Sequence, residues 1–227
     1  MNTILITGAN RGLGLEFVRS YAAEGWRVHA CCRHPEKAKA LSEIAGDVVV
    51  HKLDVTDGLR VAGLTRALAD EPIDILINNS GVYHRAAGEF GQIDYERWVE
   101  ELKVNTVAPA RMVERFVEQV AASERKLIVN ISSGMGSIAH TTSGDSIVYR
   151  SSKAGLNMVV KCLSHALAER GITVVALSPG WITTDMGGPE AELTPAESIA
   201  KMRVVIDRLT PADNGRFFNH EGEERPW

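Results

Sequence analysis

The sequence has few cysteines, and none falls in a pattern that would make it structural or metal-binding. Only three occur in 227 residues, two of them adjacent (Cys31 and Cys32), and no Cys-x-x-Cys or His-Glu-x-x-His motif accompanies the seven histidines. Disulfide frameworks and recognisable zinc sites need such spacings. We therefore expect reduced thiols packed as small hydrophobes, a cytoplasmic location and no metal site.

Long apolar runs and basic clusters are also missing. No segment approaches the roughly 20 apolar residues that a membrane-spanning helix needs, and residues 1–6 do not have the basic leader of a signal peptide. Lys and Arg number 25 against 29 Asp and Glu, a net charge of −4. These absences argue against a membrane partner and against nucleic-acid binding.

What is present is ordinary globular composition and a regular alternation of two patterns. Short, continuous apolar segments are typical of strands covered on both faces, and the stretches between them have helical periodicity. Strands are expected at residues 3–7, 27–32, 48–53, 73–78, 127–132, 172–178 and 216–219. Helices are expected at 12–24, 35–44, 57–68, 95–120, 149–170 and 195–208. The alternation predicts one α/β domain over residues 1–227, with a doubly wound, mostly parallel seven-stranded sheet and helices on both faces.

A glycine-rich segment, TGANRGLG at residues 7–14, follows the first expected strand and opens the first helix. Gly8 permits a tight turn, Gly12 lets the backbone approach a diphosphate, and Gly14 allows close helix–strand contact. The helix N-terminus offers N–H donors to the anion. The spacing differs from the standard dinucleotide fingerprint, and many glycine turns only reverse the chain. Its place between a strand and a helix favours a dinucleotide site.

The end of the second expected strand reads ACCR, at residues 30–33, without the acidic residue that selects NAD. Arg33 is suited to a 2′-phosphate, and Arg11 in the glycine segment would add a second cation. The alternative is that both are solvated surface residues. The pattern predicts that NADP(H) is preferred over NAD(H).

Tyr149 and Lys153 stand four residues apart and so share one face of a helix. A tyrosine at its ordinary pKa of about 10 is a poor acid–base group at neutral pH, and a nearby cation lowers that pKa. Alone, this spacing is common in surface helices. Together with the glycine segment it predicts general acid–base chemistry.

At this point the chain resembles the short-chain dehydrogenase/reductase family, nearly end to end, and more narrowly its C-factor/sniffer-like carbonyl reductases. The motifs that carry the resemblance are residues 7–14, NNSG at 78–81, KVN at 103–105, ISS at 131–133, Tyr149-x-x-x-Lys153, SPG at 178–180, the segments 133–138 and 179–188, and the ending RPW at 225–227. The resemblance implies a Rossmann-type sheet. It also implies a homodimer or homotetramer paired through the long helices.

The resemblance implies roles for individual residues. Tyr149 would exchange a proton with the substrate oxygen, Lys153 would lower the Tyr149 pKa and hold the nicotinamide ribose, and Ser133 would hydrogen-bond the substrate. Asn105 would kink the fourth helix and hold a water. The implied cofactor-binding residues are Gly8, Asn10, Arg11, Gly12, Leu13, Gly14, Arg33, Asp54, Val55, Asn79, Gly81, Lys153, Pro179, Gly180, Ile182 and Thr184. Without the resemblance, Asn105 reads as a polar helix residue and Asp54 as a charge at a helix start.

Two features concern the substrate-binding region, which we place at residues 134–148 and 181–195. The interval from Ser133 to Tyr149 is longer than is usual in the family, so Ser132 stays open as the substitute serine, and the loop around His140 lies at the pocket mouth. The segment between Gly188 and Pro195 is short, which favours a shallow, tolerant pocket.

Together these observations predict an NADPH-dependent reductase that converts a ketone, aldehyde or quinone to an alcohol, with Tyr149 as the acid/base. One alternative is a cofactor-binding signalling or regulatory protein of C-factor type with incidental turnover. Another is an epimerase or dehydratase, which usually needs a further C-terminal domain.

Overall fold

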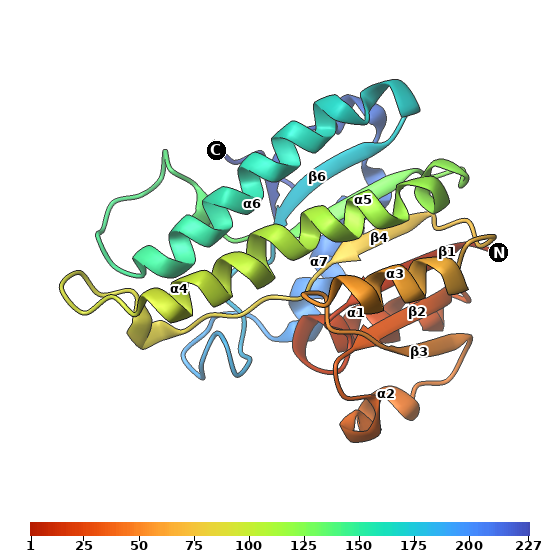
Figure 1. Cartoon of the computed structure of the whole chain (residues 1–227), viewed down its shortest axis with the longest axis horizontal. Helices are drawn as coiled ribbons and strands as arrows, with labels where there is room; N and C mark the ends of the chain where they lie inside the picture. Colours follow the sequence, from red (N-terminus) through yellow and green to blue (C-terminus); the bar gives the residue numbers. More distant parts are fainter.

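The computed structural model describes residues 1–227 and contains one seven-stranded, all-parallel sheet (Figure 1). The strands lie in the order β3-β2-β1-β4-β5-β6-β7. Their bounds are β1 Thr3–Thr7, β2 Arg27–Cys32, β3 Val48–Lys52, β4 Ile75–Asn78, β5 Leu127–Ile131, β6 Thr173–Ser178 and β7 Phe217–Asn219. The expected fold is therefore confirmed, with strand ends that differ by at most two residues.

Helices cover both faces of this sheet. Their bounds are α1 Gly12–Ala23, α2 Lys39–Ser42, α3 Gly58–Ala67, α4 Tyr95–Leu102, α5 Ala108–Ala121, α6 Ile147–Ala166 and α7 Pro195–Arg208. Helices α1 and α7 pack together over one hydrophobic core, while α3, α5 and α6 enclose the other. In no helix do length and apolar character together reach what crossing a bilayer requires.

The central strands β1, β4, β5 and β6 are fully buried, as their unbroken apolar sequences predict. The edge strand β3 is different, because none of its residues is buried. The prediction that every strand is covered on both faces is wrong for β3.

The prediction of one continuous helix at 35–44 is also wrong. A 3₁₀ turn at Pro35–Lys37 is separated from the four-residue α2 by Ala38, whose ψ of 53° is not helical. That break lets the chain turn inward, so that both Ala38 and Leu41 are buried in the core beside α1. Burial of two apolar side chains outweighs helical continuity in this short segment.

The expected helix at 95–120 forms, but one turn of it is not an α-helix. Residues Lys103–Val107 form a π-helical turn between α4 and α5. A π turn inserts one extra residue and is frequent at functional sites. Asn105 lies at its centre and is fully buried.

Candidate active site

The glycine segment forms a tight loop between β1 and α1. Gly8 has a φ of +67°, which glycine adopts without strain. A Cβ on Gly14 would lie 2.2 Å from the Gly8 carbonyl oxygen, so no other residue fits at Gly14 without movement. Asn79 donates its side-chain N–H groups to the carbonyl oxygens of Thr7 and Gly8, at 2.9 and 3.2 Å. The end of β4 thus holds the loop in place.

The first turn of α1 is left with free backbone donors. Arg11 occupies the N-cap position, and no side chain caps the helix. Such a helix start attracts a diphosphate through its N–H groups and its dipole. Asn10 and Arg11 are exposed, whereas Leu13 packs partly against the core. The loop therefore fits the diphosphate of a dinucleotide.

Arg33 and Asp54 follow the ends of β2 and β3. Arg33 is exposed, and no acidic side chain forms an ion pair with it. Asp54 accepts hydrogen bonds from the backbone and hydroxyl of Thr56, at 2.9 and 2.7 Å. Partial burial acts to raise the pKa of Asp54, but the bonds from Thr56 and the charge of Arg33 outweigh it and lower the pKa. Asp54 is therefore an ionised carboxylate just after the end of β3.

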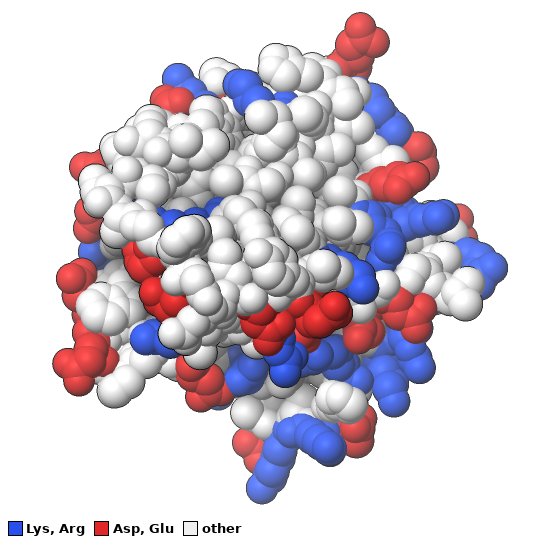
Figure 2. All heavy atoms as spheres, turned by 60° about the vertical axis from the view of Figure 1, so that its left-hand side comes forward, with Lys and Arg blue, Asp and Glu red and all other residues white.

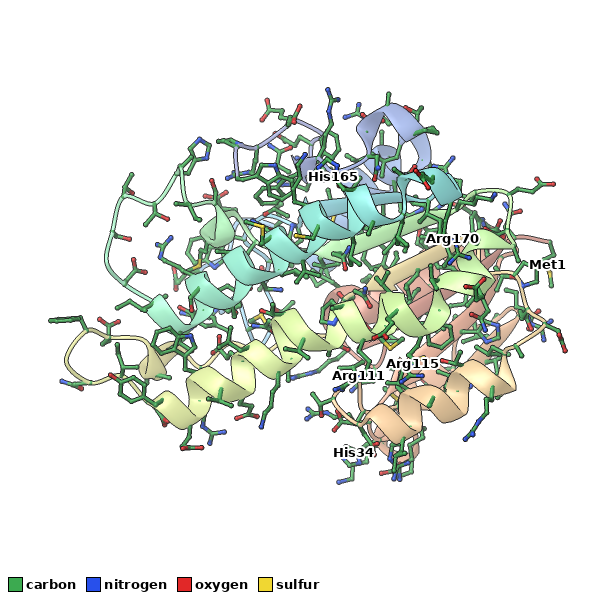
Figure 3. All side chains as sticks on the ribbon, turned by 45° about the horizontal axis from the view of Figure 1, so that its top comes forward. Met1, His34, Arg111, Arg115, His165 and Arg170 are labelled. Atoms are coloured by element: carbon green, nitrogen blue, oxygen red, sulfur yellow. The ribbon has the colours of Figure 1, made fainter.

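The loop after β3 is fixed from the helix layer. Arg111 of α5, labelled in Figure 3, donates from its guanidinium to the carbonyl oxygen of Thr56 at 2.7 Å. Val55 in this loop is buried in the core beside α5. The loop that carries Asp54 is thus held against α5.

Tyr149 and Lys153 lie one turn apart on α6, and both are buried. The Lys153 Nζ atom lies 5.8 Å from the centre of the Tyr149 ring and donates to the carbonyl oxygen of Ile131 at 2.9 Å. The Ser133 hydroxyl is close enough to the Tyr149 phenol to act on its pKa. Ser132 instead donates to Asn157 at 2.6 Å inside the protein. The geometry places Ser133, and not Ser132, beside the tyrosine.

Burial dominates the electrostatics of this pair. It raises the pKa of Tyr149 above its ordinary value, an effect that the nearby Ser133 hydroxyl opposes and the carboxylate of Glu101 reinforces. The expected lowering of the Tyr149 pKa by Lys153 is therefore not seen in the structure. The free energy needed to remove a phenolate from water exceeds the stabilisation that its neighbours provide. Burial also lowers the pKa of Lys153 to about 8, against the opposing effect of Glu101.

Asn105 connects the π turn to the segment after β4. Its side chain accepts from the backbone N–H of Val82 and donates to the Val82 carbonyl oxygen, each at 2.9 Å. It also donates to the Ser152 hydroxyl at 2.9 Å. Gly81 lies beside both Asn105 and Lys153. A Cβ on Gly81 would lie 3.4 Å from the Asn105 side-chain oxygen and 3.7 Å from the Lys153 Nζ atom. The predicted distortion of the helix at Asn105 is present.

The loop after β6 closes the other side of the glycine segment. Asp185 forms an ion pair with Arg11, and the Thr184 methyl lies beside Gly12. Arg11 is thus ion-paired, so it is not the free second cation that was expected. Of the two arginines, only Arg33 has no acidic partner. Ile182 is buried and bridges to Leu193.

Pro179 and Gly180 form the turn that leads into this loop. The Pro179 carbonyl oxygen accepts from the Ser198 hydroxyl of α7 at 2.8 Å. Gly180 has a φ of +85°, a conformation that is strained for other residues, and a Cβ on it would lie 3.1 Å from the His220 and Leu193 side chains. The predicted residues of the β6 end therefore share one edge of the sheet with the glycine loop.

Two residues that the sequence analysis did not single out lie against this centre. The Tyr83 ring packs on the Tyr149 ring with centroids 4.4 Å apart, and its hydroxyl is 2.8 Å from that of Ser146. Glu101 is fully buried and accepts from His84. Spacing contained a signal for Glu101, because it precedes Asn105 by four residues and so shares its helix face. No pattern distinguished Tyr83.

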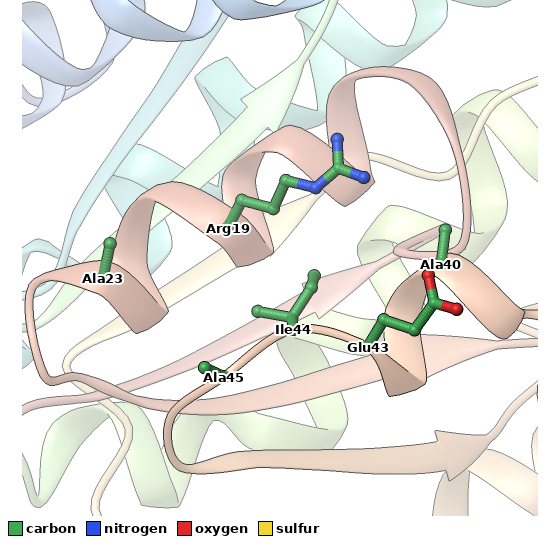
Figure 4. A pocket seen from close by; sticks show the side chains of 6 residues that line it. All are labelled: Arg19, Ala23, Ala40, Glu43, Ile44 and Ala45. Carbon is green, nitrogen blue, oxygen red and sulfur yellow. The ribbon is translucent and has the colours of Figure 1, made fainter.

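A cavity at the surface lies elsewhere. It measures about 350 Å³ and lies between the second half of α1 and the segment around α2 (Figure 4). Its lining residues are Arg19, Ala23, Ala40, Glu43, Ile44 and Ala45. None of the glycine-loop residues, Tyr149, Lys153 or the residues after β6 lines it, so it is not the candidate site.

The side of the molecule at which the strands end is largely uncharged in its middle (Figure 2). Acidic and basic side chains form the rim of this face. Tyr149, with only 7% of its surface exposed, opens onto little solvent. This arrangement suits an uncharged reacting group.

A family model described as short chain dehydrogenase matches residues 2–193. The chain belongs to the short-chain dehydrogenase family. Among curated relatives, the C-signal protein of Myxococcus xanthus is 39% identical over 156 residues, which are 69% of this chain and 93% of the relative.

Two solved carbonyl reductases resemble this short-chain dehydrogenase over its whole length. The carbonyl reductase Sniffer of D. melanogaster is 31% identical, with a TM-score of 0.94 and 100% of both chains covered. The NADPH-bound carbonyl reductase from chicken fatty liver is 33% identical, with a TM-score of 0.93 and 100% and 99% covered. The protein is an oxidoreductase of the sniffer/C-factor-like type.

Proposed function

We propose that the protein is an NADPH-dependent reductase of small or aromatic ketones, aldehydes or quinones. The observation that carries the proposal is the buried Tyr149, which lies near Ser133 and one helical turn from Lys153, beside the glycine loop. Both structural relatives are carbonyl reductases, which supports the substrate class, and the NADPH bound to one of them supports the cofactor.

The residues of the chain fit a dinucleotide. The bare backbone of Gly12 and the uncapped start of α1 would hold the diphosphate, Asp54 and Asn79 would flank the adenosine, and Arg33 would take the 2′-phosphate. Thr184 and the backbone of Ile182 would hold the carboxamide. When bound, the reduced nicotinamide supplies a hydride to the carbonyl carbon.

The protein's own part is to place the carbonyl and to deliver a proton. Ser133 donates a hydrogen bond to the carbonyl oxygen, and the Tyr149 hydroxyl transfers its proton to that oxygen as negative charge develops. The raised pKa of Tyr149 suits this direction, because the phenol is protonated at neutral pH. The Lys153 ammonium then stabilises the phenolate that remains.

Turnover and binding by a Tyr149→Phe variant test this proposal. NADPH and NADH oxidation is measured with a panel of dicarbonyls, quinones and aromatic aldehydes. Removal of the hydroxyl is expected to lower kcat by about 10²- to 10⁴-fold, the usual contribution of a general acid, with NADPH binding retained. The matched control is Tyr95→Phe, since Tyr95 lies on α4 with 68% of its surface exposed; it should match the wild type.

Other outcomes contradict the proposal in distinct ways. Tight NADPH binding without turnover of any compound would favour a cofactor-binding regulatory protein, the alternative to which the similarity to C-signal points. Turnover that persists in Tyr149→Phe would remove the tyrosine from the chemistry. Equal rates with NADH and NADPH would refute the cofactor preference.

A further inference from the structure

Tyr83 is the aromatic residue that packs directly on Tyr149, and the reaction proposed above does not use it. The centres of the two rings are 4.4 Å apart, and their planes are inclined by 36°. A tyrosine on a helix has two common rotamers about its Cα–Cβ bond, and these carry its hydroxyl to different places. The α6 backbone alone therefore does not fix the Tyr149 hydroxyl, and a side chain packed on the ring is needed to select one rotamer.

The backbone on either side of Tyr83 is fixed by two buried residues. The Asn105 side chain accepts the Val82 N–H and donates to the Val82 carbonyl oxygen, each at 2.9 Å. The Oε1 atom of Glu101 accepts the His84 N–H at 2.6 Å and lies 3.1 Å from the His84 ring Nδ1 atom. Asn105 and Glu101 are both fully buried. The segment that carries Tyr83 is therefore clamped immediately before and immediately after this residue.

The Tyr83 ring is held at two further points. Its hydroxyl lies 2.8 Å from the hydroxyl of Ser146, the buried residue at the N-cap of α6. The Arg85 guanidinium lies over the ring, with its carbon 5.7 Å from the ring centre. The same guanidinium donates to the carbonyl oxygens of Met186 and Gly187, at 3.1 and 2.6 Å. The ring is thus tied both to the start of α6 and to the loop after β6.

We propose that Tyr83 is a positioning residue, whose ring holds Tyr149 in the single rotamer that serves proton transfer. Helices α4 and α6 lie side by side, so a segment clamped on α4 presents its ring to a residue of α6 (Figure 1). The role in turnover rests on the proposed function, in which the Tyr149 hydroxyl must meet the substrate oxygen. Proton transfer requires hydrogen-bond distance between these two oxygens, so a displaced hydroxyl slows it.

The kinetics of three variants test this role. Tyr83→Leu removes the ring and is expected to lower kcat by about 10- to 100-fold, the cost of a misplacement near 1 Å, with KM for NADPH and for the carbonyl compound little changed. Tyr83→Phe keeps the ring and loses only the hydroxyl, so it should retain most of kcat. The matched control is Tyr95→Leu, the same change at an exposed ring on α4, which should match the wild type.

Two kinetic outcomes would overturn the proposal. Rates are expressed per NADPH-binding site, so that unfolded protein is not counted. Fewer sites in Tyr83→Leu, each with an unchanged kcat, would show that the ring only stabilises the fold. A raised KM for the carbonyl compound with kcat unchanged would show that Tyr83 contacts the substrate and does not position Tyr149.

NMR tests the hold of Tyr83 on Tyr149 without turnover. The chain has only four tyrosines, so in protein labelled with ¹³C,¹⁵N-tyrosine the two signals are assigned from Tyr83→Phe and Tyr149→Phe. In the wild type we expect Overhauser contacts between the two rings and three-bond couplings of one Tyr149 rotamer. In Tyr83→Leu the couplings should become averaged, whereas in Tyr83→Phe they should not.

Rotamer averaging of Tyr149 in the wild type would refute the proposal even if Tyr83→Leu does not fold. A single, unchanged rotamer in a folded Tyr83→Leu variant would refute it as well. A wild-type protein that shows the ring contact and the single rotamer, yet turns over no carbonyl compound, would instead refute the reductase while the hold of Tyr83 on Tyr149 stands.

Discussion

Gly14, in the first turn of α1, leaves less room for a side chain than Gly8 or Gly12. A methyl group there would lie 2.2 Å from the Gly8 carbonyl oxygen, and 2.7 Å from the Asn79 amide that fixes the loop. Neither backbone nor amide can yield without moving the start of α1. The requirement is one of space, since Gly14 is not among the glycines with positive φ.

Gly14→Ala is therefore expected to abolish measurable NADPH binding and to destabilise the protein by roughly 1–3 kcal/mol, the usual range for overpacking. Calorimetric titration and urea unfolding measure the two effects. The matched control is Gly63→Ala, in the middle of α3 with open space around it. Alanine there should stabilise the protein by up to about 1 kcal/mol through helix propensity. Unchanged binding in Gly14→Ala would contradict the loop's assigned role.

Helices α1 and α7 are joined by Arg203, whose side chain is almost completely buried between them. Its guanidinium donates to Ser20 at 2.7 Å and to Glu24 at 2.5 Å, and lies 3.7 Å from the centre of the Tyr21 ring. Charge-assisted bonds of this kind contribute more than exposed pairs do. The layer on this face of the sheet thus depends on one side chain more than on any surface contact.

Arg203→Met keeps the apolar stem and removes the charged head. We expect a loss of roughly 2 kcal/mol in the free energy of unfolding, because the hydrogen bonds and the contact with the ring are lost together. Lys201→Met on the same helix breaks the exposed pair with Glu221 and should cost less than about 1 kcal/mol. Urea unfolding compares the two; equal losses would show that Arg203 acts as an ordinary surface residue.

The elements differ in how far their sequence determines them. Strands β1, β4, β5 and β6 are predictable because burial on both faces leaves an unbroken apolar run, and α7 because its Thr194–Glu197 capping box is formed. The break at Ala38 is not predictable, since the burial of Ala38 and Leu41 depends on α1. Local periodicity does not carry that information.

Prediction of the site residues from local sequence patterns has the same limit. The loop glycines, Tyr149 and Lys153 were predictable because their spacing is local. Tyr83 was not, since only the packing of the segment after β4 against α6 brings its ring onto Tyr149. The direction of the Tyr149 pKa shift could not be predicted either, because it depends on burial and not on the neighbouring cation.

At the scale of the whole molecule, the proposed cofactor site joins separate parts of the chain. The glycine loop contacts the loop after β6 through Arg11 and Asp185, and the latter loop is tied in turn to Arg85, which donates to the Gly187 carbonyl oxygen at 2.6 Å. A dinucleotide bound along this edge would contact the ends of β1, β2, β3 and β6. Binding should therefore stabilise the cooperative fold as a unit.

NADPH at 100 times its Kd is expected to stabilise the protein by about 2.7 kcal/mol, which for a domain of this size raises Tm by roughly 5–10 °C. Arg33→Ala removes the unpaired guanidinium proposed for the 2′-phosphate. Loss of such a charge-assisted bond weakens binding about tenfold or more, so at the same concentration the increase in Tm should be roughly halved.

Three comparisons in the same thermal-shift experiment isolate the cause. The smaller increase with NADH, which carries no 2′-phosphate, should be the same in the wild type and in Arg33→Ala. Arg66→Ala, an exposed arginine on α3 without an acidic partner, should keep the full NADPH effect. Tyr149→Phe should also keep it, since the hydroxyl acts on the substrate. If Arg33→Ala retains the full NADPH effect, selectivity does not reside at the end of β2. A shift as large with NADH as with NADPH would remove the basis for an NADP(H) preference altogether.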